Sequence, residues 1–72
     1  MIMKLKFAER LKELRLEAGL TQKQLSIELK GKIDQSSIAR WELGVRIPLI
    51  DAVIILAKYF GVSLDYLCGL ED

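Results

Sequence analysis

The stretch TQKQLSIELKGKIDQSSIARWE, residues 21–42, holds two short helical patterns separated by a Lys-Gly turn. It opens with a capping box, Thr-x-x-Gln, in which Gln24 is the residue that reaches back to the first amide. After the turn, Asp34 has the side chain of a helix N-cap, and an amphipathic run follows it. The stretch therefore predicts two consecutive helices, at about 22–29 and 35–43.

Apolar residues at helical spacing predict three more helices. The first, at about 6–18, has this inner face: Phe7, Leu11, Leu14 and Ala18. The next, at about 50–60, ends before Gly61 and has these apolar positions: Val53, Leu56, Ala57 and Phe60. Ser63 can cap a last helix at about 64–68. Since no convincing strand pattern occurs, the 72 residues predict one all-α domain, a compact set of five short helices.

Residues 1–5 allow two interpretations. A short period-2 pattern begins here, in which Met1, Met3, Leu5 and Phe7 alternate with Ile2, Lys4 and Lys6. One interpretation is a frayed N-terminus. The other is a short extended arm that packs on a partner subunit.

The chain is poor in reactive side chains. It has no histidine, and Cys68 is its single cysteine. One thiol cannot form an internal disulfide, and without histidine it makes no plausible Cys/His metal site. Nucleophilic catalysis by cysteine needs a base that the chain lacks. We therefore expect no enzyme, no metal, no cofactor and no evident small-molecule ligand, with Cys68 as an apolar packing residue.

Hydropathy and charge indicate where the protein is located and what it can bind. No run of about 18 uncharged apolar residues occurs, so the sequence predicts no membrane span. Residues 1–4 are too short for a signal peptide, which predicts a cytoplasmic protein. The formal net charge is +1, with five basic and three acidic side chains between residues 21 and 48. That local excess is only a weak indication of nucleic-acid binding.

The helix expected at about 35–43 has two contrasting faces. Its inner side carries Ile38 and Trp41, and its outer side carries Gln35, Ser36, Ala39 and Arg40. In the DNA major groove, glutamine can pair with adenine, arginine can pair with guanine, and serine can donate or accept. The face therefore predicts DNA base reading. An ordinary solvent-exposed helix face is the alternative.

Three segments also resemble a known family. They are ERLKELRLEAGLTQKQLS, SSIARWELGVRIP and LAKYFGVSLDYLCG, and they cover nearly everything from Phe7 to Gly69. They resemble the Cro and phage-repressor type helix-turn-helix family, the lambda-repressor-like or xenobiotic-response-element proteins. The resemblance implies a five-helix domain whose third helix enters the major groove of double-stranded DNA. It also implies a sequence-specific transcription regulator that binds as a dimer.

The resemblance assigns roles to individual residues. The base-reading positions are Gln35, Ser36 and Arg40. The positions that contact the DNA backbone are Gln22, Ser37 and Arg46. Arg15 and Glu42 match an ion pair that ties the first helix to the third. The sequence agrees, because Arg15 borders the apolar face of its helix and Glu42 directly follows Trp41. A solvated, weak pair is the alternative.

This chain departs from the family pattern at three places. The turn between the second and third helices, Leu29 to Asp34, is two residues longer. It either brings Lys32, or its neighbour Lys30, toward a phosphate or bulges into solvent. Leu43 stands where relatives often have an asparagine that contacts the DNA backbone. Leu49 takes the place of a polar N-cap, so the helix that follows relies on Asp51 and the helix dipole.

The helix at about 50–60 is apolar nearly all round, and a 72-residue domain cannot bury every side of it. We expect a subunit interface there or on the last helix, formed by Ile54, Ile55, Tyr59, Val62 and Tyr66. Scattered surface apolar residues are the alternative.

Two functional hypotheses follow. The first is a DNA-binding regulator, a homodimer on a palindromic operator with half-sites about 34 Å apart. It would be associated with the nucleoid when bound, and repression by blocking polymerase is the expected output. The second is a protein-interaction module, such as an antitoxin, that uses the apolar surface of the helix at about 50–60.

Overall fold

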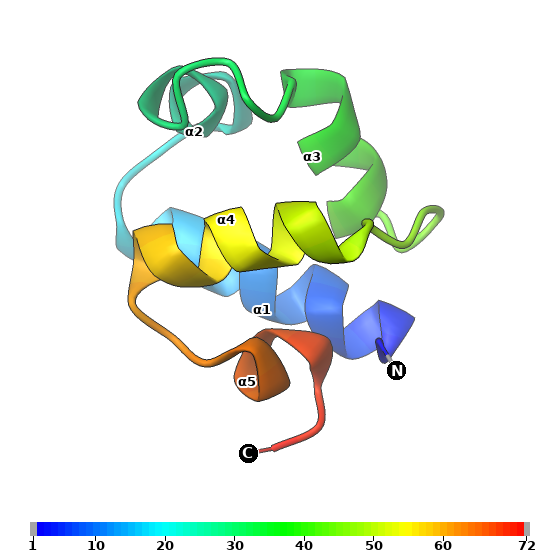
Figure 1. The fold of residues 1–72 in the computed structure, drawn as a ribbon. Coiled ribbons are helices and arrows are strands. Elements are labelled where there is room, and N and C mark those ends of the chain that lie inside the picture. Colours follow the sequence, from blue (N-terminus) through cyan, green and yellow to red (C-terminus); the bar gives the residue numbers. More distant parts are fainter. Residues whose placement is uncertain (1, 72) are drawn as a thin grey trace.

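The computed structural model describes residues 2–71, and it is all-helical over that range. Five helices follow one another along the chain (Figure 1): α1 (Lys4–Glu17), α2 (Gln22–Glu28), α3 (Gln35–Glu42), α4 (Ile50–Phe60) and α5 (Leu64–Cys68). The prediction of an all-α fold with five short helices is confirmed. The predicted limits of every helix agree with the structure to within two residues.

Helices α1 and α4 lie between the other three helices. In Figure 1, α1 and α4 cross the middle of the molecule, α2 and α3 lie on one side of them, and α5 lies on the other. The closest helix pairs are α1 with α3, α1 with α5, α2 with α3, and α4 with α5. The pair α2–α3 is therefore presented at one end of the molecule, supported from behind by α1.

One hydrophobic core joins all five helices. Its buried members are Phe7, Leu11, Leu25, Leu29, Ile33, Ile38, Trp41, Val53, Leu56, Ala57, Leu67 and Cys68. Phe7 of α1 and Trp41 of α3 meet edge to face, with ring centroids 6.1 Å apart. This geometry is favourable for aromatic pairs and fixes the inner side of α3 against α1. Cys68 is a free, buried thiol in this core, as expected.

Side-chain caps begin two of the helices. Thr21 Oγ1 accepts from the Gln24 amide at 3.0 Å, and Gln24 Oε1 accepts from the Thr21 amide at 2.9 Å, so the predicted capping box is present. Ser63 Oγ accepts from the Tyr66 amide at 2.9 Å and caps α5. Leu49 gives α4 no side-chain cap, and Asp51 lies in its first turn. The local signals were therefore sufficient for the starts of α2 and α5, whereas Asp34, the N-cap residue of α3, makes no side-chain cap bond.

Residues 4 and 5, which were expected in a frayed end or an extended arm, belong to α1 instead. α1 already begins at Lys4, the Met3 amide donates to the Cys68 carbonyl at 2.8 Å, and Ile2 packs on the core. The contact is made possible by a glycine at position 69 with φ +81°, where an added Cβ would lie 2.6 Å from the Lys6 Cβ. Met1 lies outside the described residues.

The predicted inner face of the first helix was one residue too long. α1 ends at Glu17, Ala18 is its C-cap, and Ala18 is exposed. Gly19 follows with φ +73°, the left-handed conformation that commonly ends a helix.

Candidate nucleic-acid interface

The outer side of α3 is the predicted base-reading face, and its polar side chains lie in solvent. Gln35, Ser36 and Arg40 are exposed, whereas Ile38 and Trp41 are buried in the core. Ser36 and Arg40 are four residues apart and so share one side of the helix. The structure thus places three groups that can form hydrogen bonds on the surface of a helix whose opposite side is fixed.

Asp34, at the N-cap of α3, accepts hydrogen bonds from two serines of the first turn. Its Oδ2 accepts a hydrogen bond from the Ser36 hydroxyl, and its Oδ1 accepts one from the Ser37 hydroxyl at 2.5 Å. These two donors, Ser36 first, lower the pKa of the Asp34 carboxyl below its ordinary value. The Ser37 proton is directed to Asp34, so a phosphate contact by Ser37 requires that hydroxyl to turn away.

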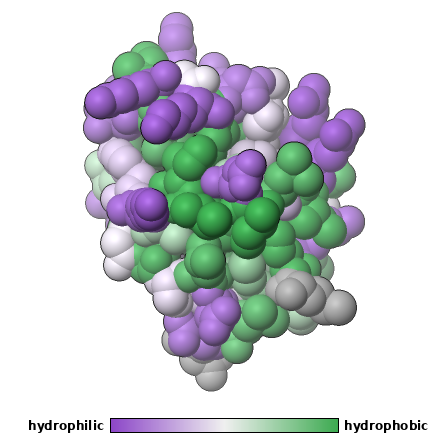
Figure 2. All heavy atoms as spheres, in the orientation of Figure 1, coloured by the Kyte–Doolittle hydropathy of each residue, from purple (hydrophilic) through white to green (hydrophobic). Residues whose placement is uncertain are grey.

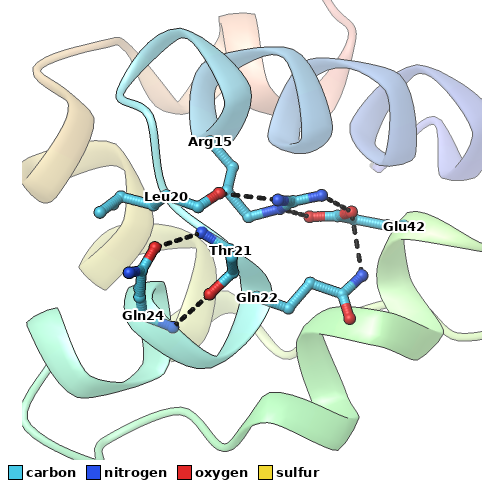
Figure 3. A network of polar contacts seen from close by, with 6 residues as sticks. All are labelled: Arg15, Leu20, Thr21, Gln22, Gln24 and Glu42. Atoms are coloured by element: carbon cyan, nitrogen blue, oxygen red, sulfur yellow. Dashed lines mark hydrogen bonds and ion pairs between the residues drawn. The ribbon is translucent and has the colours of Figure 1, made fainter.

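Arg15 of α1 and Glu42 of α3 form a two-pronged ion pair (Figure 3). Nε donates to Oε2 at 2.7 Å and Nη2 donates to Oε1 at 2.8 Å. The side chains are only 9% and 5% exposed. Arg15 Nη1 also donates to the Leu20 carbonyl at 2.8 Å, so the guanidinium joins α1, the α1–α2 turn and α3. The hydrogen bond to Glu42 raises the pKa of Arg15.

Gln22, the first residue of α2, extends this network. Its Nε2 donates to Glu42 Oε1 at 3.2 Å, which Figure 3 shows as the link between α2 and α3. A side-chain amide nitrogen carries two N–H groups, so one of them remains for another acceptor. Sequence patterns could not reveal this contact, because it depends on the angle at which the two helices meet.

The basic residues expected at the DNA backbone lie on two loops beside α3. Lys32 is exposed in the α2–α3 turn and Arg46 is exposed in the α3–α4 loop. Arg40 and Arg46 line one surface hollow, together with Ser37 and Trp41. Within the described residues the one ion pair is Arg15–Glu42, so the three outer cations have no carboxylate partner.

The longer α2–α3 turn is anchored to the core at one end. Ile33 is buried, and its carbonyl accepts from the Ser26 hydroxyl at 2.7 Å. Lys30 has φ +58°, an uncommon conformation for a residue other than glycine. Lys30 and Lys32 both remain exposed on this anchored turn. Burial of Ile33 was missed from the sequence, and its signal is a single apolar residue within a polar turn.

Exposed apolar side chains lie at the C-terminal end of α3. Of these, Leu43 was identified from the sequence as a departure from the family pattern. Leu43 is 75% exposed and Val45 is 62% exposed. Leu5 of α1, 70% exposed, lies next to them, because a Cβ at Gly44 would come within 3.2 Å of its Cδ2. None of these side chains can donate a hydrogen bond to a phosphate. The C-terminal end of α3 therefore has fewer hydrogen-bonding side chains for DNA than its N-terminal end has.

The five residues expected at a subunit interface differ in their surroundings. Ile54, Ile55, Val62 and Tyr66 are half-buried and Tyr59 is exposed. The Tyr59 hydroxyl donates to Glu28 Oε1 at 3.1 Å. The Tyr66 ring lies under the Arg10 guanidinium, 4.4 Å from the ring centroid to Cζ. These two tyrosines are thus already in contact with other helices of their own chain.

Figure 2 shows apolar side chains gathered on the side of the molecule where α4 faces the viewer. One hollow of this side, about 250 Å³, lies between the α2–α3 turn, α3 and α4. Its apolar lining is Ile33, Trp41, Leu49, Ala52 and Ile55. Because Trp41 belongs to α3, this apolar hollow extends from α4 to α3.

Two further properties concern the residues that the structure describes. None of their helices is long and apolar enough to cross a membrane. No group of three or more histidine, cysteine, aspartate or glutamate side chains in residues 2–71 is arranged to hold a metal ion.

The sequence was compared with known proteins. A helix-turn-helix family matches residues 11–67, which includes every helix described above in whole or in part. The chain belongs to this helix-turn-helix family. The prediction of family and fold is thereby confirmed, and the family consists of transcription regulators rather than enzymes.

Three relatives illustrate the match. The HTH-type transcriptional activator BcrR of Enterococcus faecalis is 32% identical over 68 residues, 94% of this chain and 32% of that protein. The uncharacterized HTH-type transcriptional regulator YobD of Bacillus subtilis is 36% identical over 66 residues, 92% of this chain and 57% of that protein. The HTH-type transcriptional regulator ImmR of B. subtilis is 36% identical over 64 residues, 89% of this chain and 49% of that protein. The chain thus spans from 32% to 57% of the length of these relatives.

Proposed function

We propose that this protein binds double-stranded DNA sequence-specifically through α3 and regulates transcription. The observation that carries the proposal is the fixed, polar outer face of α3. Gln35, Ser36 and Arg40 lie in solvent, while the Phe7–Trp41 contact and the Arg15–Glu42 pair hold the helix from behind. A rigidly supported helix with short or bidentate polar groups is what direct reading of base edges in the major groove requires.

In this proposal the phosphate contacts come from both sides of α3. Lys32 contacts the backbone from the α2–α3 turn, and Arg46 contacts it from the α3–α4 loop. Both are exposed cations without a carboxylate partner among the described residues. Gln22 adds its second amide N–H. Such contacts set the register of a protein on DNA, while base contacts select the sequence.

The proposed assembly is a homodimer on a palindromic operator. An isolated helix-turn-helix reads few base pairs, and two copies related by a two-fold axis read half-sites about 34 Å apart. The half-buried apolar residues Ile54, Ile55 and Val62 on and after α4 support a subunit contact there. The proposed output is repression by blocking polymerase, since this needs only the DNA contacts described. A reporter gene behind a selected operator tests it, and activation of that reporter would contradict repression alone.

The experiment for DNA binding is selection of bound DNA from a random double-stranded library, followed by light scattering of the complex. The proposal predicts a two-fold symmetric consensus and a mass of two protein chains per DNA. Arg15 and Glu42 must be left intact in every variant compared, because they support the fold. Lack of enrichment of any sequence at low salt would contradict the proposal.

A second function is favoured by one observation, the exposed apolar group Leu5, Leu43 and Val45 next to α3. Under this alternative the chain mainly binds another protein. The salt dependence of DNA binding separates the two. Lys32 and Arg46 from two subunits neutralise roughly four phosphates, which predicts a slope of log affinity against log salt of about −3 to −4. Weak, salt-insensitive DNA binding would favour the alternative.

A further inference from the structure

We propose that Asp34 is a specificity-determining residue, which orients the Ser36 hydroxyl so that Ser36 accepts a hydrogen bond from DNA and cannot donate one. The base opposite Ser36 is then one with an exocyclic amino group in the major groove, adenine or cytosine. This inference rests on the proposed DNA-binding function and assigns a role to a residue on which that function had not relied.

The geometry divides the Asp34 carboxylate between the two serines. Oδ2 accepts the Ser36 proton and Oδ1 accepts the Ser37 proton. Within the described residues Asp34 has no cationic partner that would withdraw it from the serines. An aspartate is ionised near neutral pH, and the hydrogen bonds from Ser36 and Ser37, which lower the pKa of Asp34, favour the same form. The ionised form is the one that can only accept.

A serine hydroxyl has one proton and two lone pairs. With the proton on Asp34, Ser36 presents only lone pairs to the groove. The donors at the major-groove edge are the N6 amino group of adenine and the N4 amino group of cytosine, whereas guanine and thymine present acceptors. An acceptor placed against guanine O6 or thymine O4 leaves two lone pairs facing each other, which is unfavourable. Asp34 thus converts an ambiguous serine into a selective one.

Ser36 and Ser37 are not equivalent, although both donate to Asp34. Ser36 is exposed beside Gln35, on the outer side of α3. Ser37 is half-buried and lines the hollows that contain Trp41 and Leu49. The base-facing acceptor is therefore Ser36. Ser37 provides a matched control on the same helix turn with the same hydrogen-bond partner.

The test is quantitative selection from a random DNA library with the wild type, Asp34→Asn, Ser36→Ala and Ser37→Ala. Asparagine keeps the shape of the side chain but is neutral and has one acceptor oxygen in place of two, so the Ser36 proton is no longer held by a charged acceptor. We expect the wild type to prefer adenine or cytosine by about 5- to 10-fold at one base pair of each half-site. Asp34→Asn and Ser36→Ala reduce that preference to below about threefold there. Ser37→Ala retains the preference, and loss of a phosphate contact at Ser37 would lower the affinity equally for all sequences.

The position dependence distinguishes this role from a simple charge effect. Removing the Asp34 charge near phosphates strengthens binding uniformly, whereas the proposed role changes preference at one base pair only. A preference at that base pair that is retained in Asp34→Asn, or in Ser36→Ala, would overturn the inference but leave DNA binding intact. If the wild type itself selects no consensus, both proposals fail. Circular dichroism checks the fold, and if Asp34→Asn does not fold, Asp34→Ala, which removes the acceptor, takes its place with the same expected result.

Discussion

Arg15 and Glu42 are joined by two parallel hydrogen bonds of 2.7 and 2.8 Å, and they connect the middle of the domain to the end of α3. The residues are 27 positions apart in the chain and nearly excluded from solvent. Bidentate pairing of this kind is geometrically specific as well as strong. The pair therefore does more than add stability, because it sets the orientation of the helix that carries Gln35, Ser36 and Arg40.

Breaking the pair at one end should be strongly destabilising. Glu42→Ala leaves the Arg15 guanidinium buried and unpaired, and the expected loss in free energy of unfolding is about 3–5 kcal/mol. Urea denaturation followed by circular dichroism measures it. Glu13→Ala, on the exposed side of α1, is the matched control and should change stability by less than about 0.5 kcal/mol. A loss for Glu42→Ala as small as that of the control would show that the pair is solvated.

Gly69 should tolerate substitution far less well than Gly61, although both have positive φ. An alanine Cβ at position 69 lies 2.6 Å from the Lys6 Cβ, whereas at position 61 it meets nothing within 4 Å. We expect Gly61→Ala to lose about 1 kcal/mol, from the left-handed backbone alone. Gly69→Ala should lose more, because the N-terminus of α1 must move. Equal losses in thermal unfolding would mean that α1 and α5 are not held together there.

The ends of the helices show how much the sequence could predict. Thr21, Gln24 and Ser63 act on amides three residues away, so their roles follow from local spacing. The start of α1 could not be found in this way. It depends on a bond from Met3 to Cys68 and on the space left by Gly69, more than 60 residues further along the chain. A single helical turn is also too short to distinguish a helical pattern from an alternating one.

The same distinction applies to the candidate site. The outer face of α3 could be predicted, because it follows from the 3.6-residue period around Ile38 and Trp41. The bond from Gln22 to Glu42 and the Tyr66–Arg10 contact could not, since they depend on how helices cross. The hydrogen bonds from Ser36 and Ser37 to Asp34 were missed for another reason. They are local, but an N-cap aspartate was expected to accept from backbone amides.

The pH dependence of Asp34 provides a separate check on its hydrogen bonds. Its folded-state pKa is lowered by Ser36 and Ser37, so its contribution to stability is present above the unfolded pKa of about 3.9 and is lost as pH falls through the lower, folded value. An NMR titration of the carboxyl carbon should place the midpoint below about 3.9. The double variant Ser36→Ala, Ser37→Ala should raise it toward the ordinary value, because it removes the two largest causes of the lowering. A wild-type midpoint at the ordinary value would contradict the serine contacts.

Leu43 stands where an asparagine could donate a hydrogen bond to the DNA backbone, and this position can be tested by substitution. Since the side chain is 75% exposed, Leu43→Asn should leave the fold intact while adding a hydrogen-bond donor at the end of α3. We expect DNA affinity to rise by about 0.5–1.5 kcal/mol, equally for all operator variants. Fluorescence anisotropy on a selected operator and on single base-pair variants measures this. A change confined to one base pair would assign position 43 to base reading instead.

If the outer face of α3 reads DNA sequence, removal of the Arg40 side chain must change the preference at a base pair. The measurement is the affinity of Arg40→Ala for the selected operator and for every single base-pair variant of one half-site, beside Lys58→Ala as a control that removes the same charge from the last turn of α4. We expect Arg40→Ala to lose about 1–3 kcal/mol of binding free energy and to relax the preference at one base pair, with little change for Lys58→Ala. A uniform loss across all variants, equal to that of Lys58→Ala, would contradict base reading by α3.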